Sequence, residues 1–221
     1  MRITLPKQDL SRGIAIIEFT LSLLFLVPLL LGTYVFGFRL IRSLEMEQIV
    51  SDLDHMYIRG INFRGPGPIQ NAQTLATGFG LTTTGQSVVI FSQIKVIQQA
   101  DCDAANPLSS PGSVHCTNLG NPVFTEEVFV GNTSLTINGA NVAKSFFGSP
   151  PLQGDQTVSV ANQGNNASAA AGNTGGPTGF AKVIALTSGE VAYMVEMITA
   201  TPDLTVSVFS GTPQVYARSI L

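Results

Sequence analysis

The side chains best suited to acid–base or metal chemistry are scarce in this sequence. Its 221 residues include two histidines, His55 and His115, and two cysteines, Cys102 and Cys116. Neither Gly-x-Ser-x-Gly, His-Glu-x-x-His, Gly-x-Gly-x-x-Gly nor a Walker sequence occurs, and these would indicate a hydrolase, a metalloprotease or a nucleotide site. We therefore expect a protein that is not an enzyme and that needs no cofactor.

Two sets of acidic residues lie close enough in sequence to suggest carboxylate chemistry. Glu126 and Glu127 are adjacent, and Glu190 and Glu196 belong to one later segment. A glycosidase needs two carboxylates at a defined spatial separation, which a sequence does not show. Both sets fall in runs with strand character, so we interpret them as the solvent-exposed face of strands.

The two cysteines allow either a disulfide or part of a metal site. Asp101, Asp103 and His115 flank Cys102 and Cys116, but two cysteines at this separation beside one histidine do not match the spacing of zinc sites. A bridge closing a loop of this length would stabilise the fold by about 3 kcal/mol in the chain-entropy model. Because the segment is expected to be exported to an oxidising compartment, we favour a Cys102–Cys116 disulfide and no metal.

Composition places the chain near a membrane rather than near nucleic acid. Charged residues make up 11% of the chain, the net charge is -3, and the mean hydropathy is +0.30. Soluble domains usually carry about 25% charged residues. Without a basic surface to neutralise phosphates, nucleic acid is not an expected partner.

The apolar residues are concentrated in one run, residues 14–38, in which Glu18 is the only charged side chain. As a helix, 25 residues would be about 37 Å long, enough to cross a hydrocarbon core of about 30 Å. A secretory signal peptide would have a shorter apolar run and an Ala-x-Ala site after it, so we reject that alternative. Arg2, Lys7 and Arg12 precede the run, which predicts a cytoplasmic N-terminus and export of the chain after about Leu40.

Glu18 needs an explanation because an ionised carboxylate near a bilayer centre costs about 2.5 kcal/mol or more. It could reach the membrane interface, be protonated, pair with a cation on another helix, or belong to a processing signal. The context, Arg12 and Gly13 followed by Ile14, then Glu18 and Phe19, favours the last two explanations together. This arrangement resembles the class III signal of type IV prepilins, which a membrane aspartyl peptidase cuts after the glycine.

The resemblance implies that residues 1–13 are a prepilin leader and that the mature chain starts at Ile14. The new amino group would then be a cationic partner for Glu18 of the same or a neighbouring subunit. Residues 12–40 look most like those of TadE-like minor pseudopilins of tight-adherence (Flp, type IVc) pilus systems, in which Glu-Phe precedes an apolar helix containing proline and glycine. The long exported part also favours this minor class over the shorter major pilins.

Membership in that family would imply a set of partners and a location. The partners are a prepilin peptidase, other minor and major pilins, membrane lipid and an inner-membrane pilus assembly platform. The location is the bacterial inner membrane, crossed once, with the C-terminal domain in the periplasm or, in an assembled pilus, outside the cell. Two alternatives stay open: a minor pseudopilin of type II secretion, which an aromatic residue in place of Ile14 would favour, and an uncleaved membrane-tethered binding module.

The remaining sequence predicts an α+β fold, a pilin-like helix followed by a small antiparallel β-sheet domain. Residues 14–59 form one transmembrane and stalk helix, kinked at Pro28 and stopped at Gly60. Leu40, Ile41 and Leu44 belong to an apolar stripe that faces the exported domain or a neighbouring helix. Residues 60–221 form the exported domain. A short helix is expected at 69–77. A glycine-rich segment, 161–179, is expected to be a mobile exposed loop or, as the alternative, a subunit contact that orders on assembly. Strands are expected near 86–99, 122–131, 134–138, 181–202, 204–210 and 214–220, with a hairpin turn at 187–190.

Overall fold

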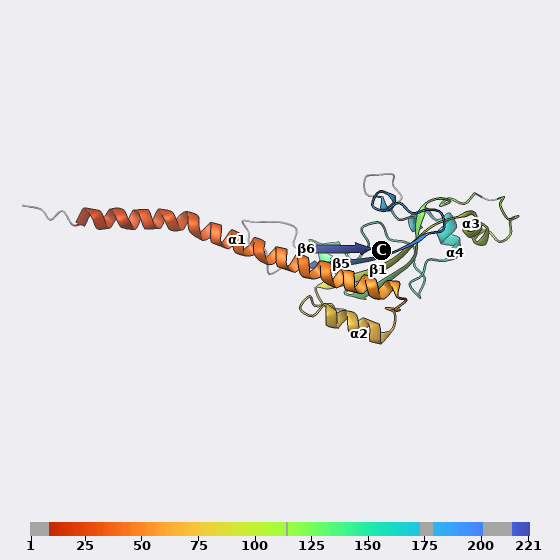
Figure 1. Cartoon of the computed structure of the whole chain (residues 1–221), viewed down its shortest axis with the longest axis horizontal. Helices are drawn as coiled ribbons and strands as arrows, with labels where there is room; N and C mark the ends of the chain where they lie inside the picture. The colour runs from red at the N-terminus through yellow and green to blue at the C-terminus, as the bar shows by residue number, and fades with distance from the viewer. Residues whose placement is uncertain (1–8, 114, 173–178, 201–213) are drawn as a thin grey trace, which may run out of the picture.

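The structure is a computed structural model that describes residues 9–113, 115–172, 179–200 and 214–221, with side chains from residue 15 onward. A single long helix, α1 (Asp9–Ile58), projects from a small α+β domain (Figure 1). At 50 residues the helix is about 75 Å long, more than twice what a bilayer core requires. The predicted fold class, a long apolar helix followed by a small antiparallel sheet, is confirmed.

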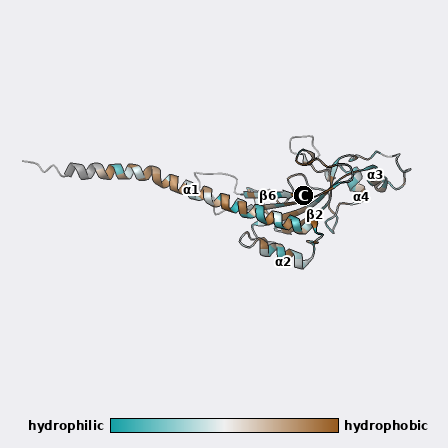
Figure 2. Ribbon diagram, in the orientation of Figure 1, coloured by the Kyte–Doolittle hydropathy of each residue, from teal (hydrophilic) through white to brown (hydrophobic). Residues whose placement is uncertain are grey.

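Helix α1 has two parts with different surroundings. Its N-terminal part projects into open space, whereas four side chains of its C-terminal part, Met46, Val50, Leu53 and Tyr57, recur at spacings of four and three and are buried in the domain. Figure 2 shows the change as a largely brown segment giving way to alternating teal and brown turns. An amphipathic stripe of this period is what a helix needs to pack on a sheet.

The ends and the bend of α1 follow from particular residues. The helix stops after Ile58, and Gly60 follows with a φ of 82°, a left-handed conformation that glycine adopts without strain. The predicted stop at Gly60 is therefore confirmed. Pro28 lies inside the helix, which runs through it without interruption and bends gently along its length (Figure 1). Proline has no N–H to donate, so one backbone hydrogen bond is missing at that turn.

The domain covers only part of the apolar stripe on α1. Leu40, Ile41 and Leu44, expected to face the domain or a neighbouring helix, are 52%, 54% and 57% exposed. The domain reaches α1 at Arg42, which donates to the Gly78 carbonyl at 3.0 Å, and the first side chain of α1 in the core below it is Met46. Leu40, Ile41 and Leu44 therefore lie outside that core. Periodicity identified the correct helix face but not the point at which the sheet begins to cover it.

The domain is built on a four-stranded antiparallel sheet in the order β2-β1-β5-β6. The strands are β1 (Ser87–Val96), β2 (Pro122–Gly131), β5 (Val191–Ala200) and β6 (Gln214–Ile220). A separate short pair joins β3 (Thr136–Ile137) and β4 (Ala140–Asn141). The expected strands at 86–99, 122–131 and 214–220 are found, whereas the strand expected at 204–210 lies outside the described residues.

Two helices cover one face of the sheet. Helix α1 and the short α2 (Pro66–Leu75) enclose a core with Phe63 and Phe91, whose rings stack with centroids 4.0 Å apart. Helix α2 starts three residues earlier than the predicted 69, because Pro66 occupies the first turn, where its missing N–H has no cost. This packing fixes the direction in which α1 leaves the domain.

The other face of the sheet is covered by short helices and irregular segments. They comprise α3 (Gln99–Ala105), α4 (Val160–Asn165), η1 (Ala167–Ala169) and η2 (Phe180–Lys182). Phe124, Phe147 and Phe180 are central to this second core. Because the sheet is buried on both faces, a strand residue is enclosed whichever side it faces.

Two irregular segments differ from the sequence prediction. Residues 161–172, expected to be a mobile loop, form α4 and η1, and Ala169, Ala170 and Ala171 are buried with the Ala171 N–H donating to the Pro122 carbonyl at 2.9 Å. Small side chains allow this close approach to the edge of β2. The rest of the expected loop, 173–178, lies outside the described residues. Residues 183–186 lie outside regular elements, so the strand expected at 181–202 begins later, at Val191 of β5, and its last two residues lie outside the described residues. The expected turn at 187–190 is present, with the Glu190 N–H donating to the Thr187 carbonyl at 3.0 Å.

Candidate functional site

The N-terminal part of α1 is apolar around its whole circumference. Ile16, Phe25 and Phe36 are 66%, 73% and 71% exposed, and they belong to a continuous series of exposed Leu, Ile, Val and Phe side chains. A soluble monomer does not normally leave such a large contiguous apolar surface in water. Of the described residues, this is the one helix long and apolar enough to cross a membrane.

Glu18 is the only carboxylate within this apolar surface. The hydroxyls of Thr20 and Ser22 donate to the backbone carbonyls of Ile16 and Glu18 at 2.8 Å and 2.9 Å, so they need no partner outside the helix. The ion pairs Arg64–Glu126 and Lys95–Asp101 lie in the domain, far along the chain from Glu18. Unlike these two hydroxyls, the Glu18 carboxylate has no such hydrogen bond to the backbone of its own helix among those described, so it is the polar group here that most needs a partner from outside the helix.

The residues of the predicted processing signal all lie on the same helix. Gly13 and Ile14 are in the early turns of α1, and Glu18 lies one turn after Ile14. Phe19, next to Glu18, is 65% exposed. An amino group created at Ile14 would thus start one helical turn away from the carboxylate, on the same side of the helix.

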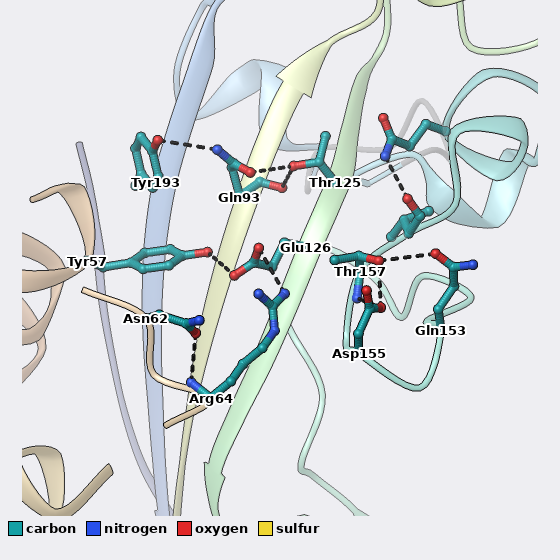
Figure 3. A network of polar contacts seen from close by, with 12 residues as sticks. Tyr57, Asn62, Arg64, Gln93, Thr125, Glu126, Gln153, Asp155, Thr157 and Tyr193 are labelled. Atoms are coloured by element: carbon teal, nitrogen blue, oxygen red, sulfur yellow. Dashed lines mark hydrogen bonds and ion pairs between the residues drawn. The ribbon is translucent and has the colours of Figure 1, made fainter. Parts of the chain in front are cut away.

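A polar network fastens the other end of α1 to the sheet (Figure 3). The Tyr57 hydroxyl at the end of α1 donates to Glu126 Oε1 of β2 at 3.3 Å, and Arg64 Nη2 lies 2.9 Å from Glu126 Oε2. Burial and the neighbouring Glu126 carboxylate raise the pKa of the Tyr57 hydroxyl, so Tyr57 stays a donor at all physiological pH values. One carboxylate thereby links the helix, the loop after it and the sheet.

A second set of polar groups continues the network along the sheet. Gln93 Nε2 donates to the Tyr193 hydroxyl at 3.3 Å, and the Thr125 hydroxyl donates to Gln93 Oε1 at 2.9 Å (Figure 3). These contacts join β5, β1 and β2 beside the end of α1. The Tyr193 ring also packs edge-on against Tyr57 of α1, with centroids 5.2 Å apart, so the network lies against the end of the helix.

Three carboxylates of the domain and of α1 are buried. Glu127 and Glu196, expected on exposed strand faces, are 1% and 0% exposed, and Asp54 of α1 is 0% exposed. Burial raises the pKa of Asp54, and the hydroxyl of Ser219 offsets part of that shift. Burial and the nearby Glu196 raise the pKa of Glu127 to about 8. The alternation of polar and apolar residues along a strand could not reveal the burial of Glu127 and Glu196, because both faces of the sheet are covered.

Glu196 lies among several donors. Its Oε1 atom accepts hydrogen bonds from the Phe146 N–H at 3.0 Å and the Tyr216 hydroxyl at 2.5 Å. Burial raises the pKa of Glu196, while these donors, Ser145 and the charge of Arg218 act in the opposite direction. Glu190, the other carboxylate of that segment, instead lies at the turn, where it accepts from the Thr187 N–H at 2.6 Å.

The predicted disulfide is present. Cys102 of α3 and Cys116 are bonded, with their Cα atoms 5.4 Å apart. Asp101 accepts from Lys95 Nζ at 2.6 Å, and Asp103 accepts from the Gly112 N–H at 3.0 Å, so both serve the local structure. The described residues contain no group of three or more His, Cys, Asp or Glu side chains able to hold a metal ion.

Comparison of the chain with protein-family models, curated proteins and solved structures finds no match.

Proposed function

We propose that this protein is a minor pseudopilin of the TadE-like kind that takes part in assembly of a tight-adherence (Flp) type IV pilus. The observation that carries the proposal is α1, a continuous helix whose N-terminal part is apolar on all sides and whose C-terminal part is fixed to an antiparallel sheet. Such a helix can occupy the bilayer before assembly and pack against similar helices afterwards. The sequence Gly13–Ile14–(x)₃–Glu18–Phe19 supports the narrower assignment.

In this proposal Glu18 is a positioning residue for helix assembly. Cleavage after Gly13 creates an amino group on Ile14, and the carboxylate of a neighbouring subunit's Glu18 pairs with it in an apolar environment. The intact pair roughly balances its own desolvation, whereas one unpaired charge costs several kcal/mol. The pair therefore selects the register in which helices pack, while small residues and apolar ridges supply most of the attraction.

The proposed location is the bacterial inner membrane, with the N-terminus in the cytoplasm and the domain in the periplasm. The disulfide between Cys102 and Cys116 agrees with an oxidising compartment. The expected partners are the prepilin peptidase, other minor and major pilins and the assembly platform in the membrane. We assign the protein no catalytic step of its own.

The pairing role predicts how Glu18→Ala behaves. The variant should still insert in the membrane, because it removes a charge from the apolar segment. It should enter the assembled complex at least tenfold less efficiently, since several kcal/mol separate paired from unpaired states. Membrane fractionation and cross-linking to neighbouring subunits measure the two properties separately.

The matched control is Glu47→Ala, which removes an exposed carboxylate from the same helix outside the apolar segment. This variant should assemble like the unmodified protein. If Glu18→Ala also assembles normally, Glu18 does not set helix register, and a membrane-tethered domain without pilus assembly becomes the better assignment.

A further inference from the structure

The two ends of the sheet differ in charge. At one end lie residues 77–86, which precede β1, and residues 131–142, which follow β2 and include β3 and β4; these two loops contain no Asp, Glu, Lys or Arg. The opposite end of the sheet carries Lys95, Asp101 and Glu190. The first end, formed by residues 77–86 and 131–142, is the charge-free end of the domain.

Hydrogen bonds hold the two loops of the charge-free end together. The Asn132 side-chain amide donates to the Gly85 carbonyl at 2.8 Å, and the Asn132 N–H donates to the Ser87 carbonyl at 3.0 Å. The apolar side chains of Phe79 and Leu135 are buried. The exposed positions include residues with hydroxyl groups, namely Thr82, Thr83, Thr84, Thr133, Ser134 and Thr136. This end therefore presents uncharged hydrogen-bonding groups to its surroundings.

Helix α1 leaves the domain at the charge-free end. Arg42 Nη1 donates to the Gly78 carbonyl at 3.0 Å, and the Arg42 guanidinium lies 5.0 Å from the centroid of the Phe79 ring. Figure 1 shows α1 projecting from the end of the domain at which β6 begins. At that end β5 finishes at Ala200, whose N–H donates to the Gln86 carbonyl at 2.8 Å.

The distance along α1 between the apolar run and this contact is short. Phe38 ends the apolar run, and Arg42 is four residues later, about 6 Å along the helix axis. The polar headgroup layer is roughly 5–7 Å thick on each side of a bilayer, because the core is about 30 Å thick and the whole about 40–45 Å. With the apolar run in the hydrocarbon core, the loop at residues 77–86 lies at the depth of the headgroups.

We propose that the charge-free end of the domain contacts the phospholipid headgroups of the bilayer that α1 spans. This proposal depends on the part of the proposed function that places α1 in a membrane. Hydroxyl and amide side chains donate to lipid phosphate and ester oxygens, and no charge has to be desolvated to form the contact. Leu40, Ile41 and Leu44 of α1, each more than half exposed, lie at the same depth, so lipid covers them as well.

The composition of the two loops also predicts which lipids are needed. Basic side chains draw proteins to anionic lipid, at about 1 kcal/mol for each Lys or Arg near the membrane surface. Because residues 77–86 and 131–142 contain neither, their contact with the bilayer should not depend on anionic lipid. Attachment through α1 and through the charge-free end together holds the sheet upright on the membrane, with the opposite end directed away from it.

Fluorescence quenching in reconstituted membranes measures the depth of the loops. Cys102 and Cys116 are bonded to each other, so one introduced cysteine can be labelled with a fluorophore. The full-length variants Thr83→Cys and Ser188→Cys are placed in phosphatidylcholine vesicles that contain a lipid with a nitroxide on its headgroup. Both residues are exposed, and Ser188 precedes β5, whose ten residues place it about 30 Å from the charge-free end.

We expect the label at Thr83→Cys to lose as much fluorescence as a label at Leu40→Cys of α1. The label at Ser188→Cys should lose none. The loss at Thr83→Cys should stay the same when phosphatidylglycerol replaces half of the phosphatidylcholine. Equal quenching of the labels at residues 83 and 188 would overturn the proposal, and so would quenching at residue 83 that requires phosphatidylglycerol.

A label within the apolar run separates this proposal from the proposed function. Leu24→Cys, at a side chain 66% exposed, should be quenched by a lipid that carries the nitroxide on its acyl chain. Quenching at residue 24 without quenching at residue 83 overturns only the contact of the charge-free end. Absence of quenching at residue 24 overturns both. In membranes that contain the partner proteins, a photoreactive group at residue 83 should attach to lipid; attachment to a protein instead would mean that another subunit covers this end.

Discussion

Replacing Glu127 by glutamine should change how the stability of the domain depends on pH. The pKa of Glu127 is 4.5 in an unstructured chain and about 8 in the folded protein. Between these values the folded state holds a proton that the unfolded state has released. The free energy of unfolding therefore falls as the pH rises: the contribution is complete below the unfolded pKa and is lost by the folded pKa.

The size of the effect follows from the same two values. Each pH unit in this window changes the free energy of unfolding by about 1.4 kcal/mol. From pH 5 to pH 9 the unmodified protein should thus lose about 4 kcal/mol through Glu127 alone. Glutamine does not ionise, so Glu127→Gln should lose none of this stability as the pH rises.

Urea unfolding of both full-length proteins in the same detergent, followed by circular dichroism at pH 5, 7 and 9, measures the difference. Burial also raises the pKa of Glu196 and of Asp54, so the unmodified protein has further pH dependence of the same sign. The informative quantity is the free energy of unfolding of the variant minus that of the unmodified protein. This difference should become more positive from pH 5 to pH 9. Parallel pH profiles would refute the assignment of a buried, protonated Glu127.

Two further predictions test the packing of α1 and the disulfide. Leu53→Ala, at a fully buried position, should destabilise the domain by about 3 kcal/mol in urea unfolding, whereas Leu44→Ala, at a side chain 57% exposed, should change stability by less than about 0.5 kcal/mol. Equal effects would mean that α1 is docked differently. Removing the bridge with Cys102→Ser should cost about 3 kcal/mol, and a reducing agent should lower the stability of the unmodified protein but not of the variant.

The sequence was a good guide to elements that depend on local signals. Uninterrupted apolar residues and Gly60 set the extent of α1, and β-branched residues bounded by glycine, proline or asparagine set β1, β2 and β6. Cys102 and Cys116 were paired correctly because no third cysteine competes. Each of these features is determined by residues close together in the chain, or by a single possible pairing.

Features that depend on tertiary contacts were not predictable in the same way. Glu127 occupies a strand position that would face water in a sheet covered on one side, but it is buried here, and the Ser145 backbone interacts with its carboxylate. The alanine-rich segment before residue 173 has no large apolar side chain, yet Ala169 is fully buried because β2 lies beside it. Leu44 has the periodicity of a core residue but lies before the point where the sheet covers α1.

The processing of the N-terminus tests the central claim most directly. The protein, expressed with an active prepilin peptidase and purified from membranes, would be analysed by intact-mass and N-terminal peptide mass spectrometry. The pseudopilin assignment predicts a chain that begins at Ile14, and a Gly13→Leu variant should keep its leader. A protein that retains residues 1–13 while the same peptidase cleaves a control prepilin would contradict the assignment and leave only an anchored domain.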